Sequence, residues 1–475
     1  MILRKSKKDI LNGIVPEQII IFTVPLVGSY LLQQAYQIVD SIILGRYVGK
    51  IALAAIGASN SIVNVILNLI SGISAGIMIV LAQNMGGSNT EKAKQTVKTG
   101  MFIAVVLGGI LTLSVVLLAR RILELTGCPQ EAISDSLVYL KLYAFSFIPY
   151  LIVSIGNYTF RAVGDSKSSI TLTLIIAVSK IVLDILLTAV FKTGIWGVSI
   201  STFASQMICA IVVLSVFGTT PEFYHYSLLE FGFDSDILKR VLSIGTPVAI
   251  QSMLFAFSNL IIQAKINTYG TDTIAAFSAY NSVDNYYWCF ANAIASALMT
   301  LCGQNYGNKN NKRVKEFIKH GLIIDVIGTA LIGACAIIFG NNLLSMYTTD
   351  TNVINIAYNM LKRVAIFYPT YIFIEVISAA IKACGDTTNS MIITLIGICV
   401  VRVTYVLFVP FTNALQVLYC YPISWIITST IFIIYYAFFK KRKLSWYFQG
   451  NKIFNFFQKS YWLWYLIRVN IEKMS

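Results

Sequence analysis

The residues best suited to ion chemistry are charged side chains that interrupt long apolar stretches of the chain. The first is Asp40, in the apolar stretch 15–44. Polar residues precede it at the spacing of one helical face, at Gln33, Tyr36 and Gln37. A carboxylate inside a membrane span costs roughly 2.5–3.5 kcal/mol, so this face is expected to line a protein interior or a wet cavity. Asp40 is therefore either an ion or proton site or an interfacial charge that reaches the lipid headgroups.

A lysine and an aspartate lie together in a later apolar stretch. Lys180 and Asp184 stand four residues apart in the stretch 170–191, on one helical face. At a rise of ~1.5 Å per residue, Asp184 lies about 21 Å from one membrane face, and Thr202 lies about 9 Å from the other. The two heights are similar in a core of ~30 Å, so Asp40, Asp184 and Thr202 are expected to meet in one pocket. Lys180 either neutralises Asp184 or takes part in ion coupling.

Further polar residues in the apolar stretches are candidates for the lining of a substrate cavity. Two asparagines one turn apart fit either ordinary helix packing or a cavity wall. Aromatic residues can stack on a cationic or aromatic substrate, although core packing explains them equally well. The cavity candidates are Gln33, Tyr36, Gln37, Asn64, Asn68, Gln206, Asp284, Glu375 and Arg402, with Lys265 as a possible third member of a patch with Asp284 and Arg402, and with Tyr286, Tyr287 and Trp288 as further aromatic candidates.

The composition excludes a soluble globular protein. Of 475 residues, 57% are hydrophobic and 12% are charged, and the mean hydropathy is +0.73. This balance is typical of a polytopic membrane protein with about twelve spans and short loops. The net charge of +15 follows alternate loops, so nucleic acid is not an expected partner. The sequence contains no metal-ligand cluster, nucleophile motif or phosphate-binding glycine loop, which argues against an enzyme.

The apolar stretches divide into two sets of six. The predicted fold is all-α, with twelve transmembrane helices in two six-helix bundles. The predicted boundaries are a cytoplasmic N-terminus 1–14, a first bundle 15–217, a cytoplasmic linker 218–240, a second bundle 241–439 and a basic, aromatic cytoplasmic tail 440–475. Lysine and arginine gather in alternate loops, and the positive-inside rule then places both termini in the cytoplasm.

An internal repeat relates the two sets of spans. RAVGD, which ends at Asp165, returns as KACGD, which ends at Asp386 (386 − 165 = 221). QNMGG begins at Gln83 and returns as QNYGN from Gln304 (304 − 83 = 221). Because six is even, the two halves have the same orientation in the membrane. Parallel repeats are typical of transporters that rock two bundles about a central cavity; a duplicated scaffold without transport is the alternative.

On these features the chain resembles the multidrug and toxic-compound extrusion (MATE) transporters, most closely their bacterial DinF-like branch. The resemblance covers about residues 10–440. It rests on the six-plus-six layout, on Pro25 and Asp40 in the first span, and on the Q-N-x-G and G-D loops of each half. It implies a bacterial plasma-membrane antiporter that extrudes organic cations or other amphipathic drugs against sodium or protons. It also implies that Asp40, Asp184 and Thr202 form the cation site.

Two positions depart from the pattern of the resembled family. Lys180 stands where relatives commonly carry an asparagine, and Phe255 stands where one branch has a glutamate ion ligand. Glu375 lies one turn from another acidic family position. Because Lys180 can reach Asp184 across one helical turn, it can hold that carboxylate charged and leave Asp40 free to exchange a proton. Protons are therefore favoured over sodium as the coupling ion, and no bound cofactor or metal is expected.

The expected partners are small drug-like molecules and membrane lipids, and the chain is expected to act as a monomer. The alternative function is a lipid-linked oligosaccharide flippase of the same broader superfamily, which requires a basic cavity for a pyrophosphate. Lys180, Lys265 and Arg402 favour this alternative. Asp40 and Asp184 oppose it. The two-bundle repeat disfavours a channel.

Overall fold

The protein is built of α-helices in the computed structural model, which describes residues 10–48, 50–125, 128, 130–220, 224–226 and 231–444. No β-strand occurs among these residues. The chain up to Ile433 forms one compact unit, and all the contacts described below lie within it.

The helices of the first half supply six membrane-spanning segments, of which the fourth is a bent pair. They are α1 (Val15–Tyr47), α2 (Lys50–Gly86), α3 (Thr90–Leu125), the short 3-10 helix η1 (Gln130–Ala132), α4 (Ile133–Ala144) bent against α5 (Phe147–Ala162), α6 (Ser166–Asp184) continued by the π-helix η2 (Ile185–Val190), and α7 (Ile195–Thr219).

The second half repeats this order of elements. Its helices are α8 (Ser235–Ile266) with the 3-10 turn η4 (Asn267–Tyr269), α9 (Thr271–Gly307), α10 (Asn311–Ile338), α11 (Gly340–Ser345), α12 (Thr351–Ala365) bent against α13 (Tyr368–Ala383), α14 (Thr387–Thr394) continued by the π-helix η5 (Leu395–Val400) and α15 (Val401–Phe408), and α16 (Ala414–Val417) followed by α17 (Cys420–Arg442).

Twelve spans account for the described helices. Nine helical segments are long and apolar enough to cross a bilayer, and the two bent pairs bring the number to eleven. The twelfth is α9, which has 37 residues and is therefore long enough to span a bilayer. The predicted all-α fold of two six-helix halves is therefore confirmed.

The bent pairs occupy equivalent places in the two halves. The bend is 48° between α4 and α5 and 53° between α12 and α13. Each second helix has a proline in its first turn, Pro149 in α5 and Pro369 in α13. Proline is tolerated in a first turn because its missing N–H has no helical partner there, but it cannot continue the preceding helix. The repeated proline thus explains a repeated break.

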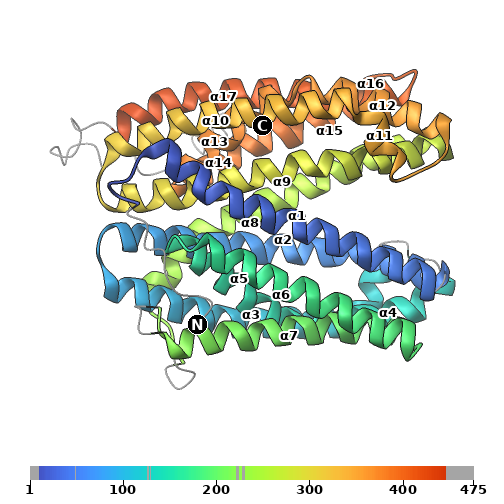
Figure 1. The fold of residues 1–475 in the computed structure, drawn as a ribbon, viewed down its shortest axis with the longest axis horizontal. Helices are drawn as coiled ribbons and strands as arrows, with labels where there is room; N and C mark the ends of the chain where they lie inside the picture. The colour runs from blue at the N-terminus through green and yellow to red at the C-terminus, as the bar shows by residue number, and fades with distance from the viewer. Residues whose placement is uncertain are drawn as a thin grey trace, which may run out of the picture. The chain divides into compact units, whose positions relative to one another are not determined.

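The two halves meet along four helices. In Figure 1 the helices of the first half run from blue to green and those of the second from yellow to orange, and α1, α2, α8 and α9 lie along the boundary between the groups. The helix α2 packs against α8 and α9, and α1 packs against α9. We call one end of the helices the basic end: there α2 and α9 end and α3 and α10 begin. The first turns of α3 and α10 and the connection before α10 carry Lys92, Lys94, Lys309, Lys312 and Arg313.

Glycines allow α2 and α8 to touch through their backbones. A Cβ atom added to Gly72 would lie 2.2 Å from Cα of Ala249, and one added to Gly76 would lie 2.6 Å from Cα of Gly245. Small residues at helix crossings permit this close approach in membranes, where apolar side chains gain little by leaving lipid. The contact fixes the two halves against each other on the side of the basic end.

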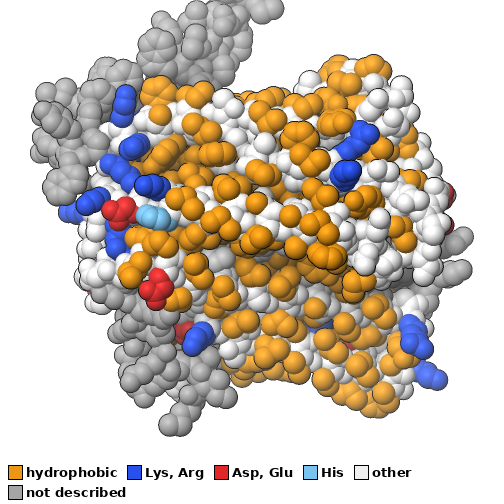
Figure 2. Space-filling model, turned by 45° about the horizontal axis from the view of Figure 1, so that its top comes forward, with side chains coloured by type: hydrophobic (Ala, Val, Ile, Leu, Met, Phe, Trp, Pro, Cys, Tyr) orange, Lys and Arg blue, Asp and Glu red, His pale blue; other side chains and the backbone are white. Residues whose placement is uncertain are grey.

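The surface matches a protein that sits in a bilayer. On the face drawn in Figure 2, lysine and arginine side chains lie toward the ends of the helices, and hydrophobic side chains cover the band between them. Large apolar residues such as Leu117, Leu331 and Phe408 are well exposed, as expected where lipid replaces water.

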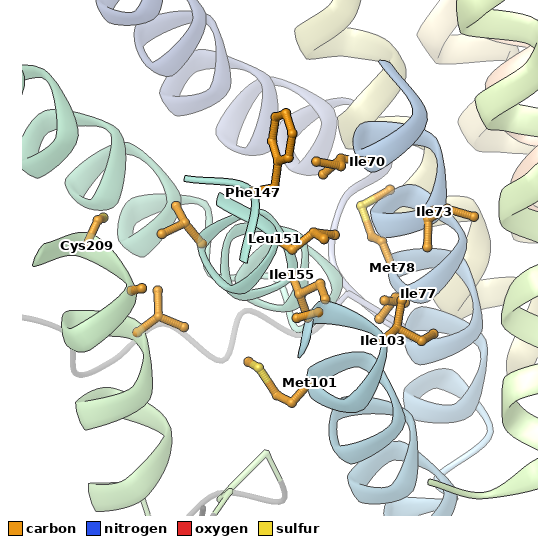
Figure 3. Packing of buried hydrophobic residues seen from close by; sticks show 14 of the residues in the cluster. Ile70, Ile73, Ile77, Met78, Met101, Ile103, Phe147, Leu151, Ile155 and Cys209 are labelled. Atoms are coloured by element: carbon orange, nitrogen blue, oxygen red, sulfur yellow. The ribbon is translucent and has the colours of Figure 1, made fainter. Parts of the chain in front are cut away.

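The core of the first half is apolar and closely packed. Figure 3 shows Ile70, Ile77 and Met78 of α2 on the side of that helix that faces α3 and α5. Ile155 of α5 packs in the same cluster. This core holds α2, the helix that contacts the second half, in a fixed position within the first.

The helix ends differ from the predicted boundaries between the halves. The helix α7 extends to Thr219, past the predicted 217, and α8 begins at Ser235, before the predicted 241. The early start has a cap: the Asp234 carboxylate accepts from the backbone N–H groups of Asp236 and Ile237 at 2.9 Å each. Residues 1–9 of the predicted N-terminal segment and 445–475 of the predicted tail lie outside the described residues.

Candidate functional site

Lys180 of α6 joins two carboxylates from different helices. Its Nζ lies 2.9 Å from Oδ1 of Asp40 on α1, and 2.7 and 2.6 Å from the two carboxylate oxygens of Asp184. An ammonium group donates hydrogen bonds and accepts none, so two carboxylates suit it. The Asp184 side chain is 1% exposed, whereas that of Asp40 is 28% exposed. Asp40 is therefore the carboxylate within easier reach of a proton or ion from outside.

Ser201, rather than Thr202, completes this group. The Ser201 hydroxyl donates to Oδ1 of Asp184 and lies 3.3 Å from Nζ of Lys180. The Thr202 hydroxyl instead donates to the Val198 carbonyl of its own helix at 2.9 Å. We call Lys180, Asp40, Asp184 and Ser201 the coupling cluster.

Helix rotation explains why Ser201, and not the predicted Thr202, lies against Asp184 in this structure. Successive residues on an α-helix point about 100° apart, so Ser201 and Thr202 face different directions at nearly the same height. The number of residues along a helix predicts the height of a side chain in the membrane but not the direction in which it points. The structure brings Asp40 and Asp184 together through Lys180, whereas the Thr202 hydroxyl is bonded within its own helix.

A polar cavity of about 940 Å³ lies between the two halves, lined by residues of both. The coupling cluster is not part of its lining. The lining includes every cavity candidate taken from the sequence: Gln33, Tyr36, Gln37, Asn64, Asn68, Gln206, Asp284, Glu375 and Arg402.

Other candidates from the sequence lie elsewhere. Lys265 is not in the cavity lining, and its Nζ lies over the ring of Phe411, 5.7 Å from the centroid. Of the aromatic candidates, Trp288 lines the cavity. Tyr287 is buried in a stack on Tyr368, with ring centroids 3.9 Å apart. The expected patch of three charges is therefore reduced to Asp284 and Arg402.

Asp284 of α9 accepts hydrogen bonds from neutral donors. Trp288 Nε1 donates to its Oδ2 at 2.6 Å, and the Tyr368 hydroxyl donates to its Oδ1. Both oxygens are thus engaged by groups within the second half. Glu375 of α13 supplies the second carboxylate of the cavity lining.

Arg402 of α15 is buried, with 1% of its surface exposed, and its guanidinium is bonded only to neutral groups. Its Nε donates to the Ser424 hydroxyl at 3.0 Å, and its Nη1 donates to the Asn259 side chain at 3.1 Å. The rings of Phe255 and Tyr421 flank it, with centroids 5.1 and 4.7 Å from Cζ. Its Nη2 has no hydrogen-bond partner among the described residues. The ring of Phe255 therefore packs against a buried cation.

Two further cations line the cavity and were not among the predicted site residues. They are Arg161 at the end of α5 and Lys382 at the end of α13. They are the first residues of the two repeated motifs, RAVGD and KACGD (382 − 161 = 221). Arg161 donates to the hydroxyls of Tyr30 at 3.1 Å and Ser296 at 3.2 Å, the second of which belongs to the other half. The repeat itself was the signal that pairs these two cations.

The Q-N-x-G motifs, which form the last turns of α2 and α9, join the halves by the same contact twice. Gln83 Nε2 donates to the Ala383 carbonyl of the second half at 2.6 Å, and Gln304 Nε2 donates to the Ala162 carbonyl of the first half at 2.6 Å. Both pairs obey the repeat offset (304 − 83 = 221 and 383 − 162 = 221). We call this pair of hydrogen bonds the latch.

Glycine at the end of each Q-N-x-G motif makes the latch possible. A Cβ atom on Gly86 would lie 1.7 Å from the carbonyl oxygen of Gln304, and one on Gly307 would lie 2.0 Å from that of Gln83. No side chain fits at those distances, so only glycine lets the two loops meet. The G-D turns that follow the latch carbonyls need glycine too, because Gly164 has φ +91°. Its counterpart in the second half has a positive φ as well.

Two pseudo-symmetric six-helix halves around a polar cavity define a membrane transporter of the two-bundle class. The MatE family model matches residues 25–186 and 247–407 of the chain, once in each half (247 − 25 = 222). The chain belongs to the MatE family, the MATE transporters, and is a transporter rather than an enzyme.

Relatives and solved structures agree with this family. The probable multidrug resistance protein YoeA of Bacillus subtilis is 26% identical over 435 residues, 89% of this chain and 94% of YoeA. An FAD transporter of Shewanella oneidensis is 22% identical and covers 88% of this chain and 96% of its own length. The fold matches a structure described as an outward-facing multidrug resistance MATE transporter with a TM-score of 0.85, 18% identity and coverage of 91% of this chain and 98% of the other.

Proposed function

We propose that the protein is a secondary active multidrug efflux transporter that exchanges amphipathic drugs, organic cations among them, for protons by alternating access. The observation that carries this proposal is the latch, which joins the two halves at one end of a polar cavity by the same contact in each half. Two equivalent contacts between two rigid bundles can be made and broken together, as a rocking motion requires. The name of YoeA, a probable multidrug resistance protein, agrees with this activity.

The coupling cluster supports protons as the driving ion. Two carboxylates and one ammonium give the cluster a formal charge of −1, which one proton neutralises. A sodium ion would compete with the Lys180 ammonium, whose Nζ is within 2.9 Å of both Asp40 and Asp184. The 28% exposure of Asp40 makes that carboxylate the site of proton exchange in this proposal.

Efflux from proteoliposomes under separately imposed gradients tests the driving ion. A pH gradient is expected to drive uptake of a fluorescent organic cation, and a sodium gradient alone is not. Asp40→Asn is expected to reach the membrane at normal levels and to lose pH-driven transport, because an amide cannot release a proton. Saturable dependence on sodium, with no response to pH, would exclude the proton proposal.

Alternating access is tested by locking the basic end. Gly87 is a suitable position, because a Cβ there would lie 3.3 Å from the Gly307 carbonyl oxygen. Cysteines at Gly87 and Asn308, joined by a cleavable bis-thiosulfonate linker, are expected to stop transport until the linker is reduced. Each single-cysteine variant, treated in the same way, is the control. Normal efflux from fully linked protein would contradict the rocking mechanism.

We propose further that the protein lies in a bacterial plasma membrane with its basic end and both termini toward the cytoplasm, and that the monomer is the working unit. The excess of lysine and arginine at the basic end supports the orientation. Labelling of a single added cysteine in the α2–α3 connection by a membrane-impermeant maleimide tests it. Reaction in intact cells would reverse the proposed orientation.

A flippase for lipid-linked oligosaccharides is the second candidate, and the charge of the cavity favours it. Three basic residues and two acidic ones line the cavity, which suits a pyrophosphate better than a simple cation. The acidic coupling cluster favours antiport instead, because a lipid flippase has no need of it. Movement of a fluorescent pyrophosphate-linked lipid between leaflets of proteoliposomes, without any ion gradient, would favour the flippase.

A further inference from the structure

The cavity holds more positive than negative charge. Its basic residues are Arg161, Lys382 and Arg402, and its acidic residues are Asp284 and Glu375. Within the described part of the chain, none of the three basic side chains makes an ion pair at 4.0 Å or less. Lys180, the buried cation outside the cavity, has two such partners. The cavity therefore has one more positive than negative charge, and none of its cations is directly paired with a carboxylate as Lys180 is.

Arg402 is the cation whose hydrogen-bonding capacity is most clearly unused. A guanidinium has five N–H donors, and in Arg402 one on Nε and one on Nη1 are engaged by Ser424 and Asn259. Both donors of Nη2 are without a partner among the described residues, and that atom is shielded from water. A buried donor left unpaired costs stability, more so when it belongs to a charged group. The side chain is therefore poised for an acceptor that this chain does not itself provide.

The surroundings define what that acceptor can be. The rings of Phe255 and Tyr421 lie against the guanidinium, so an acceptor is expected to approach its Nη1–Nη2 edge in the plane. Carboxylates and phosphates have the planar pair of oxygens that matches this edge. Trp288 and Tyr371, 4.9 Å apart between ring centroids, line the same cavity. The neighbourhood thus suits an acid group attached to an aromatic body.

We propose that the cavity binds amphipathic substrates through an acid group, with Arg402 as the anchor of that group and Lys382 as a second cation near its path. The inference rests on the proposed transport function and specifies its substrates: aromatic compounds that carry a carboxylate or phosphate, zwitterions included. Asp284 and Glu375 remain available for a basic group on the same molecule. An acid group reaches Nη2 of Arg402 when the ring of Phe255 or Tyr421 turns aside.

Two dyes that differ in one charge test the proposal. Rhodamine 110 carries a free carboxylate, and rhodamine 123 is its methyl ester, so the aromatic body is the same. Binding is measured by fluorescence anisotropy with the purified full-length protein in lipid nanodiscs. The wild type is expected to bind rhodamine 110 more tightly than rhodamine 123.

Arg402→Gln removes the positive charge and keeps a polar side chain. It is expected to raise the Kd of rhodamine 110 by about tenfold or more, as for loss of a charged hydrogen-bonded pair, and to leave that of rhodamine 123 within about twofold. Lys265→Gln is the matched control, because it removes one positive charge outside the cavity lining. It is expected to change neither Kd. Equal weakening of both dyes by Arg402→Gln, or no weakening of either, would overturn the proposal.

Lys382→Gln keeps the proposal testable if Arg402→Gln does not yield folded protein. Its side chain is only partly buried and lines the cavity, so its replacement leaves the helix packing intact. A smaller weakening, confined to rhodamine 110, is expected. Discrimination between the dyes that is unchanged in Lys382→Gln and in every folded Arg402 variant would contradict the proposal.

Inorganic phosphate separates an organic acid from a free anion. At millimolar concentration it is expected to leave rhodamine 110 bound, because it lacks the aromatic body. Complete displacement of the dye by phosphate would overturn the assignment to organic substrates.

Dye transport into proteoliposomes separates this inference from the proposed function. Charge-selective binding without transport of either dye would contradict efflux and support the acid-group site. Transport of both dyes without charge-selective binding would contradict the acid-group site and support efflux.

Discussion

The two halves of the protein each place a cation in the equivalent long helix, and they treat it in opposite ways. Lys180 of α6 and Arg402 of α15 are separated by 222 residues (402 − 180 = 222), the offset that also relates Pro25 to Pro247. Lys180 contacts two carboxylates, whereas Arg402 contacts a hydroxyl, an amide and two rings. A duplicated scaffold has kept the position of the charge and changed its surroundings.

The missing partners of Arg402 can be traced in the sequence. At the offsets of 221 and 222, Asp40 corresponds to Ile261 or Ile262, and Asp184 corresponds to Tyr405 or Val406. Neither acid therefore has a carboxylate at its matching position in the second half. A buried charge in a membrane must be compensated, and the first half does so within the protein while the second leaves compensation incomplete. We infer that the first half is built to hold a fixed charge balance and the second to accept a charge from outside.

The largest expected difference between the two halves is in the loss of stability when the cation of each half is removed. Lys180→Met leaves Asp184 buried without its partner, and loss of one member of a buried ion pair costs about 3–5 kcal/mol. Arg402→Met removes two hydrogen bonds, but it also removes a buried charge that the protein compensates incompletely, and it strands no carboxylate. The free energy of unfolding, measured by SDS titration in mixed micelles, should therefore fall much further for Lys180→Met.

A pH series is the control for this comparison. Acidification protonates stranded carboxylates, so the deficit of Lys180→Met relative to the wild type should shrink as the pH falls. Equal losses of stability in the two methionine variants at neutral pH would contradict the distinction between the halves.

Sodium is expected to replace Lys180 when its ammonium is removed. In Lys180→Asn, the oxygens of Asp40, Asp184 and Ser201 remain as ligands for a hard cation. A ligand present at a hundred times its Kd stabilises the folded state by about 2.7 kcal/mol, so sodium should raise the Tm of this variant above its Tm in choline. Differential scanning fluorimetry in matched salts measures this shift.

Arg402→Gln is the matched variant of the second half. It has no carboxylates at the positions that match Asp40 and Asp184, so its Tm should be the same in sodium and choline. A sodium response as large in the wild type as in Lys180→Asn would refute the view that Lys180 occupies the place of a metal ion.

The latch should show the opposite result, an effect in both halves. Gln83→Ala and Gln304→Ala each remove one latch hydrogen bond and leave a buried carbonyl unpaired, at about 1–3 kcal/mol. Gln83→Ala also removes a hydrogen bond that the Gln83 side chain accepts from Arg240 of α8. Each variant is therefore expected to increase the population with an open basic end, Gln83→Ala at least as much as Gln304→Ala. Double electron–electron resonance between spin labels on the α2–α3 and α9–α10 connections measures this population. Opening in only one of the two variants would mean that the halves are unequal at the latch as well.

The sequence predicted the fold and the cavity because both depend on patterns along the chain. Apolar length defines spans, the offset of 221 defines the halves, and polar residues within spans such as Asn64, Gln206 and Glu375 must face an interior. All of these line the cavity. Contacts across helices depend on rotation and tilt, which one sequence does not specify. That is why Ser201 was missed in favour of Thr202.

The contacts that the repeated motifs make could not be predicted from the sequence either. Gln83 and Gln304 were recognised as a repeat, but their acceptors are backbone carbonyls, which leave no mark in the side-chain pattern. Arg161 and Lys382 were part of the loop motifs, and only the bundle geometry turns them toward the cavity.

The smallest expected effect tests whether Ser201 or Thr202 belongs to the coupling cluster. Ser201→Ala removes a hydroxyl that donates to Asp184 and lies 3.3 Å from Lys180, so it should cost about 1 kcal/mol and slow pH-driven efflux several-fold. Thr202→Val keeps the shape of the side chain and loses a bond to the carbonyl of its own helix, so efflux should change little. The measurement is initial rates of pH-driven dye transport at matched protein levels. The corresponding residue of the second half provides the contrast, because Ser424, which matches Thr202 (424 − 202 = 222), does bond the cation of its half. A larger loss of transport in Thr202→Val than in Ser201→Ala would contradict this assignment. Thr202 would then act on the ion directly in another conformation and would belong to the coupling cluster.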